Sequence, residues 1–343
     1  MNKGIMFAAM LLILFGNGGC GKSTVIKSES TSGLAIDTKP VSSQPPASTS
    51  PTSALKHSIL VKPDGTRFNL DQLPNELDAM ADRINENIKT GKGADNFILY
   101  VHGRGQEPDK CLAKKHTCLK LQQENTAEVI MFNWQGSHDG GPAGYPNKQA
   151  EASGSDLKAV LDIYRQYKDT HKDKFGKIRS ALIVHSMGSN VLRKALDRYD
   201  DNSLGQNLFD TIILSANAVE AKGHIEWLGK IKFSDHIYVT GNEHDPILGP
   251  LARLHFDKRL GQGLKAWEKS SVELSGQANY LDFSNINGLG HQYFVKSGQK
   301  GNPYLARFFA TVLDGKPFEP KDFPGIKEQE QGNGNVVYIF KAK

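Results

Sequence analysis

The chain contains a serine, an acidic residue and a histidine in an order that suits nucleophilic catalysis: Ser186, Asp245 and His291. A serine hydroxyl attacks a carbonyl carbon when a histidine accepts its proton and a carboxylate holds that histidine in the correct tautomer. Ser186 follows the apolar run Ser180–Val184 and precedes Gly188. A sharp strand-to-helix turn needs a glycine near its serine, so this segment predicts an exposed nucleophile. The chemistry indicated is acyl transfer.

The serine and the carboxylates of this set have alternative roles, and a late histidine is unsurprising in this chain. Val184 stands where the G-x-S-x-G motif has its first glycine, and Ser186 would also suit the N-cap of a following helix. We favour Asp245 over Glu243 as the acid because Asp245 precedes a proline at a defined turn, although either carboxylate could instead be solvated in the loop. The chain has 11 histidines, and His291 is set apart by its glycine-flanked loop.

Backbone N–H groups near a second strand end are candidates for stabilising the negative charge that acyl transfer develops. The apolar run Asn96–Val101 is followed directly by His102-Gly103-Arg104-Gly105. We expect the N–H groups of Gly103, Arg104 and Met187 to form an oxyanion hole. The alternative for the first two is a plain glycine turn.

Two aromatic residues, Trp134 and Tyr145, lie beside or within the loop 135–147. They are expected either to line a pocket for the acyl or leaving group or to serve as packing residues. The sequence leaves both roles open.

Elements that alternate along the chain must bring these residues together. Short apolar runs of the buried-strand type, separated by helical patterns, occur at 96–101, 128–133, 180–184, 211–215 and 236–240. Such alternation predicts an α/β domain with a mostly parallel central sheet and helices on both faces. Before it, Pro63-Asp64-Gly65 predicts the turn of a hairpin, and 76–89 predicts an amphipathic helix. Ligands gather at the carboxyl ends of such strands.

Between Asn96 and Phe309 the sequence resembles a family of bacterial α/β-hydrolases defined as a domain of unknown function. The resemblance rests on these segments: Val101-His102-Gly103, Phe132-Asn133-Trp134, His185-Ser186-Met187-Gly188, Asp245 with Leu248, and His291-Gln292-Tyr293-Phe294. It implies a single-domain α/β-hydrolase fold, the triad Ser186, Asp245 and His291, and no metal or organic cofactor. The family commonly has Ser-Trp-Pro where this chain has Asn133-Trp134-Gln135, and often an acidic residue where Asn217 stands. These departures concern the substrate pocket more than the triad.

The first 54 residues have the composition of a targeting segment and a tether. Lys3 and the apolar run Ile5–Phe15 resemble a signal peptide, and Gly18-Gly19-Cys20 resembles a bacterial lipoprotein signal in which Cys20 is lipidated. We therefore expect a signal peptide at 1–20, a Ser/Thr/Pro-rich flexible tether at 21–54 and the hydrolase domain at 55–343. The expected location is a bacterial membrane, facing the periplasm or the exterior. An uncleaved anchor or a non-lipid signal is the alternative.

A phosphate-binding motif overlaps this segment. Residues 16–23 match G-x-x-x-x-G-K-S, which cradles nucleotide phosphates when it lies between a strand and a helix. The residues that follow, 28–53, are too rich in Ser, Thr and Pro to form that helix. Nucleotide binding is therefore not expected.

The cysteines agree with export. Cys111 and Cys118 close a short loop and are expected to form a disulfide in an oxidising compartment, while Cys20 carries the lipid. A metal site built from Cys111, His116 and Cys118 would have only three ligands at an unfamiliar spacing, so no metal is expected.

These patterns predict a serine hydrolase that cleaves a carboxylic ester or thioester of a small molecule or lipid. Whether water or another alcohol accepts the acyl group is left open. A catalytically silent binding lipoprotein on the same fold is the second hypothesis. Nucleic-acid binding has little support, because 42 Lys and Arg are interspersed with 37 Asp and Glu and the net charge is only +5.

Overall fold

The computed structural model describes residues 55–105, 117–136, 146–200, 203–255, 257–268, 272–331 and 334–341. All of them belong to one compact unit, residues 50–343. The expected signal peptide, Cys20, the tether and the phosphate-loop motif lie outside the described residues, as do Cys111 and Tyr145.

A hairpin opens the domain as the sequence predicts. Strand β1 (Ser58–Val61) pairs antiparallel with β2 (Arg67–Phe68). At the turn, Gly65 has φ +92°, and the Asp64 carboxylate accepts a 2.8 Å hydrogen bond from the Thr66 N–H. Glycine tolerates this backbone conformation, which is why Asp-Gly marks the turn in the sequence.

Parallel strands form the centre of the sheet, whose order is β2-β1-β4-β3-β5-β6-β7-β8-β10-β9. The central parallel strands are β3 (Asn96–Val101), β4 (Ala127–Trp134), β5 (Arg179–His185), β6 (Phe209–Ser215), β7 (Ser234–Gly241) and β8 (Ala278–Asp282), and β10 joins them as described below. Their carboxyl ends lie side by side, because His185 is in register with Ser215, and Ser215 with Thr240. The five predicted apolar runs are therefore strands, and their ends share one edge.

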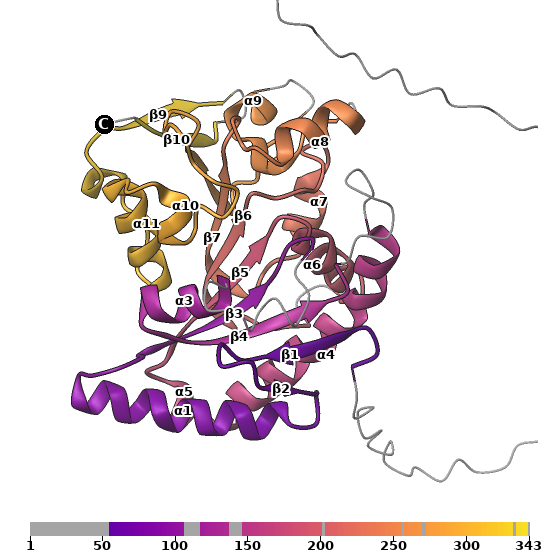
Figure 1. Ribbon diagram of the computed structural model, residues 1–343, viewed down its shortest axis with the longest axis vertical. Helices are drawn as coiled ribbons and strands as arrows, with labels where there is room; N and C mark the ends of the chain where they lie inside the picture. The colour runs from indigo at the N-terminus through magenta and orange to yellow at the C-terminus, as the bar shows by residue number, and fades with distance from the viewer. Residues whose placement is uncertain are drawn as a thin grey trace, which may run out of the picture. The chain divides into compact units, whose positions relative to one another are not determined.

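Helices cover both faces, and Figure 1 shows α10 and α11 on one side of the central strands and α6 and α7 on the other. The helices are α1 (Leu73–Thr90), α3 (Thr117–Asn125), α4 (Asn147–Thr170), α5 (Lys172–Phe175), α6 (Gly188–Leu196), α7 (His224–Leu228), α8 (Leu248–His255), α9 (Leu264–Trp267), α10 (Lys296–Gln299) and α11 (Pro303–Leu313). Short 3₁₀ turns lie at Leu260–Gln262 and Pro320–Asp322. Within the described ranges no helix has the length and apolarity that crossing a membrane requires.

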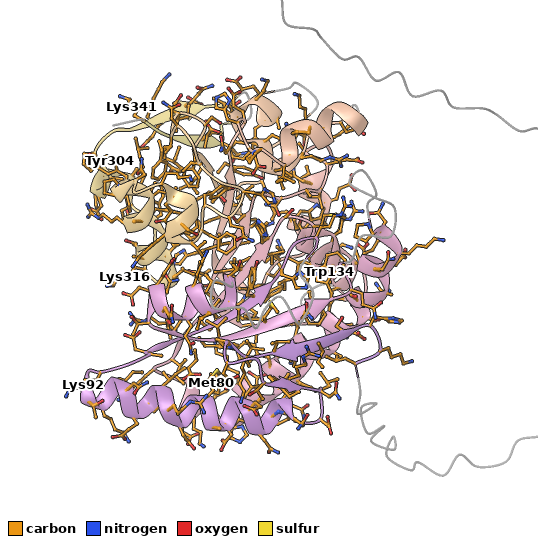
Figure 2. The ribbon with its side chains drawn as sticks, in the orientation of Figure 1. Met80, Lys92, Trp134, Tyr304, Lys316 and Lys341 are labelled. Atoms are coloured by element: carbon orange, nitrogen blue, oxygen red, sulfur yellow. The ribbon has the colours of Figure 1, made fainter. Side chains whose placement is uncertain are left out.

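Helix α1 packs on the core through the apolar residues that recur along its sequence. Leu73, Leu77, Met80 and Ile84 are buried and recur at spacings of three and four, which places them on one face of the helix. Met80 is 2% exposed (Figure 2). The helix ends at Gly91 with φ +65°, the left-handed cap that glycine favours.

Two further strands extend the sheet beyond β8. Strand β10 (Val336–Phe340) runs parallel to β8, and β9 (Ile326–Glu330) pairs antiparallel with β10 as the edge strand. The two strands that follow β8 in the described chain therefore belong to the same sheet.

Candidate active site

Ser186 occupies a sharp turn between β5 and α6, as predicted, but it is buried, with 4% of its surface exposed, and not exposed as the sequence pattern suggested. Its φ is +52°, a conformation that non-glycine residues rarely adopt outside strained turns. The Ser186 N–H donates to the Ser215 carbonyl at 3.0 Å, and the Ser186 carbonyl accepts from the N–H groups of Ala218 and Ser189 at 3.2 Å each. The last residue of β6 and a residue just after that strand thus bond to the N–H and the carbonyl of Ser186.

Gly188 fits the turn for a steric reason. A β-carbon there would lie 2.7 Å from the His102 carbonyl oxygen and 2.8 Å from that of Val101, which is too close for a real side chain. Val184, by contrast, is fully buried in β5 between Val101 and Leu214. Its side chain belongs to the core.

The end of β3 lies against the serine. A β-carbon on Gly103 would stand 2.9 Å from both the Ser186 β-carbon and the His185 Nδ1. Met187 is at the N-terminus of α6, where the first N–H groups of a helix have no acceptor within the helix. The structure therefore brings the backbone of Gly103 and the first turn of α6 to the same serine, with Arg104 next along the chain.

Asp245 and His291 are hydrogen-bonded to each other. The His291 Nδ1 lies 2.8 Å from Asp245 Oδ2 and 3.0 Å from Oδ1. The Asp245 side chain is 0% exposed and that of His291 is 16% exposed. Asp245 Oδ1 also accepts the N–H groups of Ile247 and Leu248 at 2.8 and 2.9 Å, which fixes the carboxylate.

A family model described as alpha/beta hydrolase of unknown function (DUF900) matches residues 76–300. The chain belongs to this family. The match runs from within α1 to the end of α10 and so includes the serine turn, the Asp245 loop and the His291 loop. The α/β-hydrolase fold expected from the sequence is confirmed.

Solved structures resemble the hydrolase only weakly. An esterase of Pyrobaculum calidifontis shares 15% identity and a TM-score of 0.34, over 65% of this chain and 77% of its own. An esterase of Pyrococcus furiosus shares 12% identity and a TM-score of 0.37, over 65% of this chain and 82% of its own. Similarities of this size carry no evidence about substrate. No curated protein matches the sequence.

The other carboxylate of the β7 loop has different partners in the hydrolase. Glu243 lies 3.1 Å from His244 Nε2 and 3.8 Å from Lys265 Nζ. Its backbone N–H donates to the Ser284 hydroxyl at 2.9 Å. Of the two acids that the sequence offered, Asp245 is therefore the one that contacts His291.

His102 and Trp134 brace the end of β3. The His102 Nε2 accepts the Trp134 N–H at 3.1 Å, and the Trp134 indole N–H donates to the His102 carbonyl at 2.8 Å. The rings stack at an interplanar angle of 19°. Trp134 is 1% exposed (Figure 2), a position that fits its packing alternative. Cys118 is likewise buried, in α3, and its pairing with Cys111 stays a prediction.

The structure does not show one contact of the expected set. Among the described residues, no hydrogen bond joins the Ser186 hydroxyl to His291. Such bonds are often long in ligand-free enzymes and tighten when substrate binds. His291 instead contacts His185, the residue before Ser186. The ring centroids of the two histidines lie 4.6 Å apart.

Sequence reasoning missed the side chains that hold the histidine loop. The Tyr293 hydroxyl donates to the Thr240 carbonyl at 3.0 Å and accepts the Ala216 N–H at 2.9 Å. Tyr293 is fully buried. One hydroxyl thereby joins the loop that carries His291 to the ends of β6 and β7. The only sequence signal is the short spacing from His291 to Tyr293.

Proposed function

We propose that this hydrolase cleaves a carboxylic ester or thioester through an acyl-enzyme on Ser186. The observation that carries the proposal is the hydrogen bond of 2.8 Å between the fully buried Asp245 carboxylate and His291, whose ring centroid lies 4.6 Å from that of His185, the residue before Ser186. A buried carboxylate bonded to one histidine nitrogen is the arrangement that prepares the other nitrogen to act as a base. The family assignment supports hydrolysis, and the substrate class, an ester or thioester, is the part that we propose.

In the first step, His291 accepts the Ser186 proton. A carboxylate only accepts hydrogen bonds, so the His291 Nδ1 carries the proton of that ring and Nε2 keeps its lone pair. As the Ser186 oxygen attacks the substrate carbonyl, the proton passes to Nε2, and Asp245 stabilises the imidazolium. The N–H groups of Met187 and of Gly103 or Arg104 then stabilise the oxyanion.

In the second step, the imidazolium gives its proton to the leaving alcohol or thiol as the tetrahedral intermediate collapses. Water, deprotonated by His291, then attacks the acyl-enzyme; the bond from the acyl carbon to the Ser186 oxygen breaks, His291 returns the proton to that oxygen, and the acyl group leaves as a carboxylic acid. All groups in this cycle belong to the protein, the substrate and water.

Labelling by a fluorophosphonate tests the proposal. The full chain is incubated with the probe, and the labelled peptide is identified by mass spectrometry. We expect label on Ser186, none in Ser186→Ala, slow labelling in His291→Ala, and unchanged labelling in Ser155→Ala, which removes an exposed serine of α4. A folded protein that takes no label would contradict the proposal and favour the catalytically silent binding protein.

We also propose that the enzyme is exported and tethered to a membrane through lipid on Cys20. The apolar run, the small residues before Cys20 and the Ser/Thr/Pro-rich segment support this. Replacement of Cys20 by alanine should move the protein from the membrane fraction to the soluble fraction. Equal membrane association of the two forms would contradict lipidation at this residue.

A further inference from the structure

The residue before the nucleophile, His185, makes an unusual contact across the active site. It ends β5 and is 2% exposed. Its Nε2 lies 3.2 Å from the main-chain carbonyl oxygen of His291, 106 residues away in sequence. Because a carbonyl only accepts, Nε2 carries the proton and donates it. The imidazole beside the serine therefore binds the backbone of the histidine that is to deprotonate that serine.

The surroundings fix this imidazole in one orientation. Its ring centroid lies 4.6 Å from that of His291 and 5.0 Å from that of Phe294. With the proton on Nε2, the buried Nδ1 has only a lone pair, and it has no hydrogen-bond donor. A β-carbon on Gly103 would stand 2.9 Å from this nitrogen, so the end of β3 closes that side.

His185 stays neutral in this environment. Burial lowers its pKa well below the ordinary value, and a positive charge on His291 lowers it further. The ring therefore does not compete with His291 for the serine proton. Its function must be exerted through the hydrogen bond and through packing.

We propose that His185 is a positioning residue that sets the distance between the catalytic base and the nucleophile. The inference rests on the proposed function. Asp245 holds the ring of His291, and His185 holds its main chain, so the two contacts together define where Nε2 of His291 points. His185 directly precedes Ser186, so its hydrogen bond fixes the position of the loop that carries His291 relative to Ser186. A displacement of about 1 Å between reacting groups can cost on the order of 100-fold in rate.

Substitutions at 185 in the full chain separate the hydrogen bond from packing. Glutamine places an amide N–H where the histidine Nε2 stands and can still donate to the His291 carbonyl. Leucine fills a similar volume without a donor, and asparagine has its amide nearer the backbone, short of the carbonyl. We expect kcat on p-nitrophenyl acetate to fall about 10-fold or more in His185→Leu and His185→Asn, with KM within about twofold, and to stay within about threefold of wild type in His185→Gln.

The order of kcat among the His185 variants tests the proposal. Rates of fluorophosphonate labelling should follow the same order as kcat, with the urea midpoint recorded for each protein. Wild-type kcat in His185→Leu, or equal losses in His185→Gln and His185→Asn, would overturn the positioning role. If His185→Leu does not fold, the comparison of glutamine with asparagine still decides. Absence of label on wild-type Ser186 would instead refute the proposed function, which keeps the two failures apart.

Discussion

A β-carbon placed on Gly103 would lie 2.9 Å from the β-carbon of Ser186. The end of β3 thus lies against Ser186 without space for a side chain between them. His102 and Trp134 hold this strand end through two reciprocal hydrogen bonds of 3.1 and 2.8 Å. An oxyanion hole needs donors whose positions are set before the reaction, and these bonds fix the strand end that carries Gly103, one of the proposed donors.

Gly103→Ala is expected to impair catalysis more than folding. The added methyl group must displace Ser186 or the strand end, which should lower kcat about 10- to 100-fold and the free energy of unfolding by about 1–3 kcal/mol. Steady-state kinetics and urea denaturation measure the two effects. Gly276→Ala is the control, because its β-carbon would approach the Asn335 side chain at an ordinary 3.6 Å. Full activity in Gly103→Ala would show that this contact does not matter for the site.

Asp245→Asn tests the identity of the acid. An amide can present an N–H to His291 and so favour the tautomer with its proton on Nε2, which cannot accept the serine proton. In another serine hydrolase such a change lowers kcat by about 10⁴-fold, and we expect a loss of about 10³-fold or more here. Glu243→Gln should keep nearly full activity, because Glu243 contacts His244 and Lys265 instead. The reverse pattern in p-nitrophenyl ester hydrolysis would assign the acid to Glu243.

The central strands could be predicted because parallel strands buried on both faces are continuous apolar runs. All six residues of β3 are buried, and the last six of β5. Strand β8 was not predicted, since Ala278–Asp282 is short and its first two residues are only half-buried. Strand β9 was not predicted because this edge strand contains the exposed charged residues Lys327, Glu328 and Glu330 and so has no apolar run.

The order of the candidate triad could be predicted from the sequence, but the side chains that hold its histidine loop could not. Ser186, Asp245 and His291 each follow a strand or lie in a glycine-flanked loop, which local pattern reveals. The bonds from His185 to His291 and from Tyr293 to Thr240 join residues 106 and 53 positions apart. Pairings of this kind depend on strand order, which no local pattern contains. The two roles of Trp134 stayed open for the same reason.

Trp134→Phe should loosen the end of β3 while retaining most of the buried aromatic area. The change removes the indole N–H and leaves the His102 carbonyl without that donor. We expect the free energy of unfolding to fall by about 1–3 kcal/mol and kcat to fall several-fold, with KM nearly constant if the residue does not line the pocket. A large rise in KM with unchanged kcat would instead support the pocket role.

Tyr293→Phe should weaken the hold on the histidine loop. The variant leaves the Ala216 N–H and the Thr240 carbonyl without their shared hydroxyl, inside a buried site. Loss of a buried partner costs about 1–3 kcal/mol, so the urea midpoint should fall. Because His291 is two residues away, kcat should also decrease. Tyr304→Phe is the control, since Tyr304 is half-buried on α11. Equal effects of the two changes would argue against a specific role for Tyr293.

The stability of the domain should depend on pH through His224, which is buried and bonds to residues outside the proposed triad. Its Nδ1 donates to the Ala221 carbonyl and its Nε2 accepts from the Tyr280 hydroxyl, each at 2.6 Å. Burial lowers the pKa of His224, so the unfolded chain takes up a proton near pH 6.5 that the folded protein does not. Stability from the neutral ring is therefore complete above this pH and is lost as the pH falls below it.

Urea denaturation between pH 7.5 and pH 5 measures this dependence. Each proton taken up only by the unfolded chain contributes a slope of about 1.4 kcal/mol per pH unit. His224→Gln should lower stability at every pH, since it disturbs both hydrogen bonds, but should flatten the slope below pH 6.5 by up to that amount. His57→Gln, which replaces an exposed ring, is the matched control and should leave the slope unchanged. An unaltered slope in His224→Gln would mean that this histidine is not kept neutral by the fold. In His224→Gln, the slope that remains below pH 6.5 should include a contribution from His185, because burial lowers the pKa of that histidine as well.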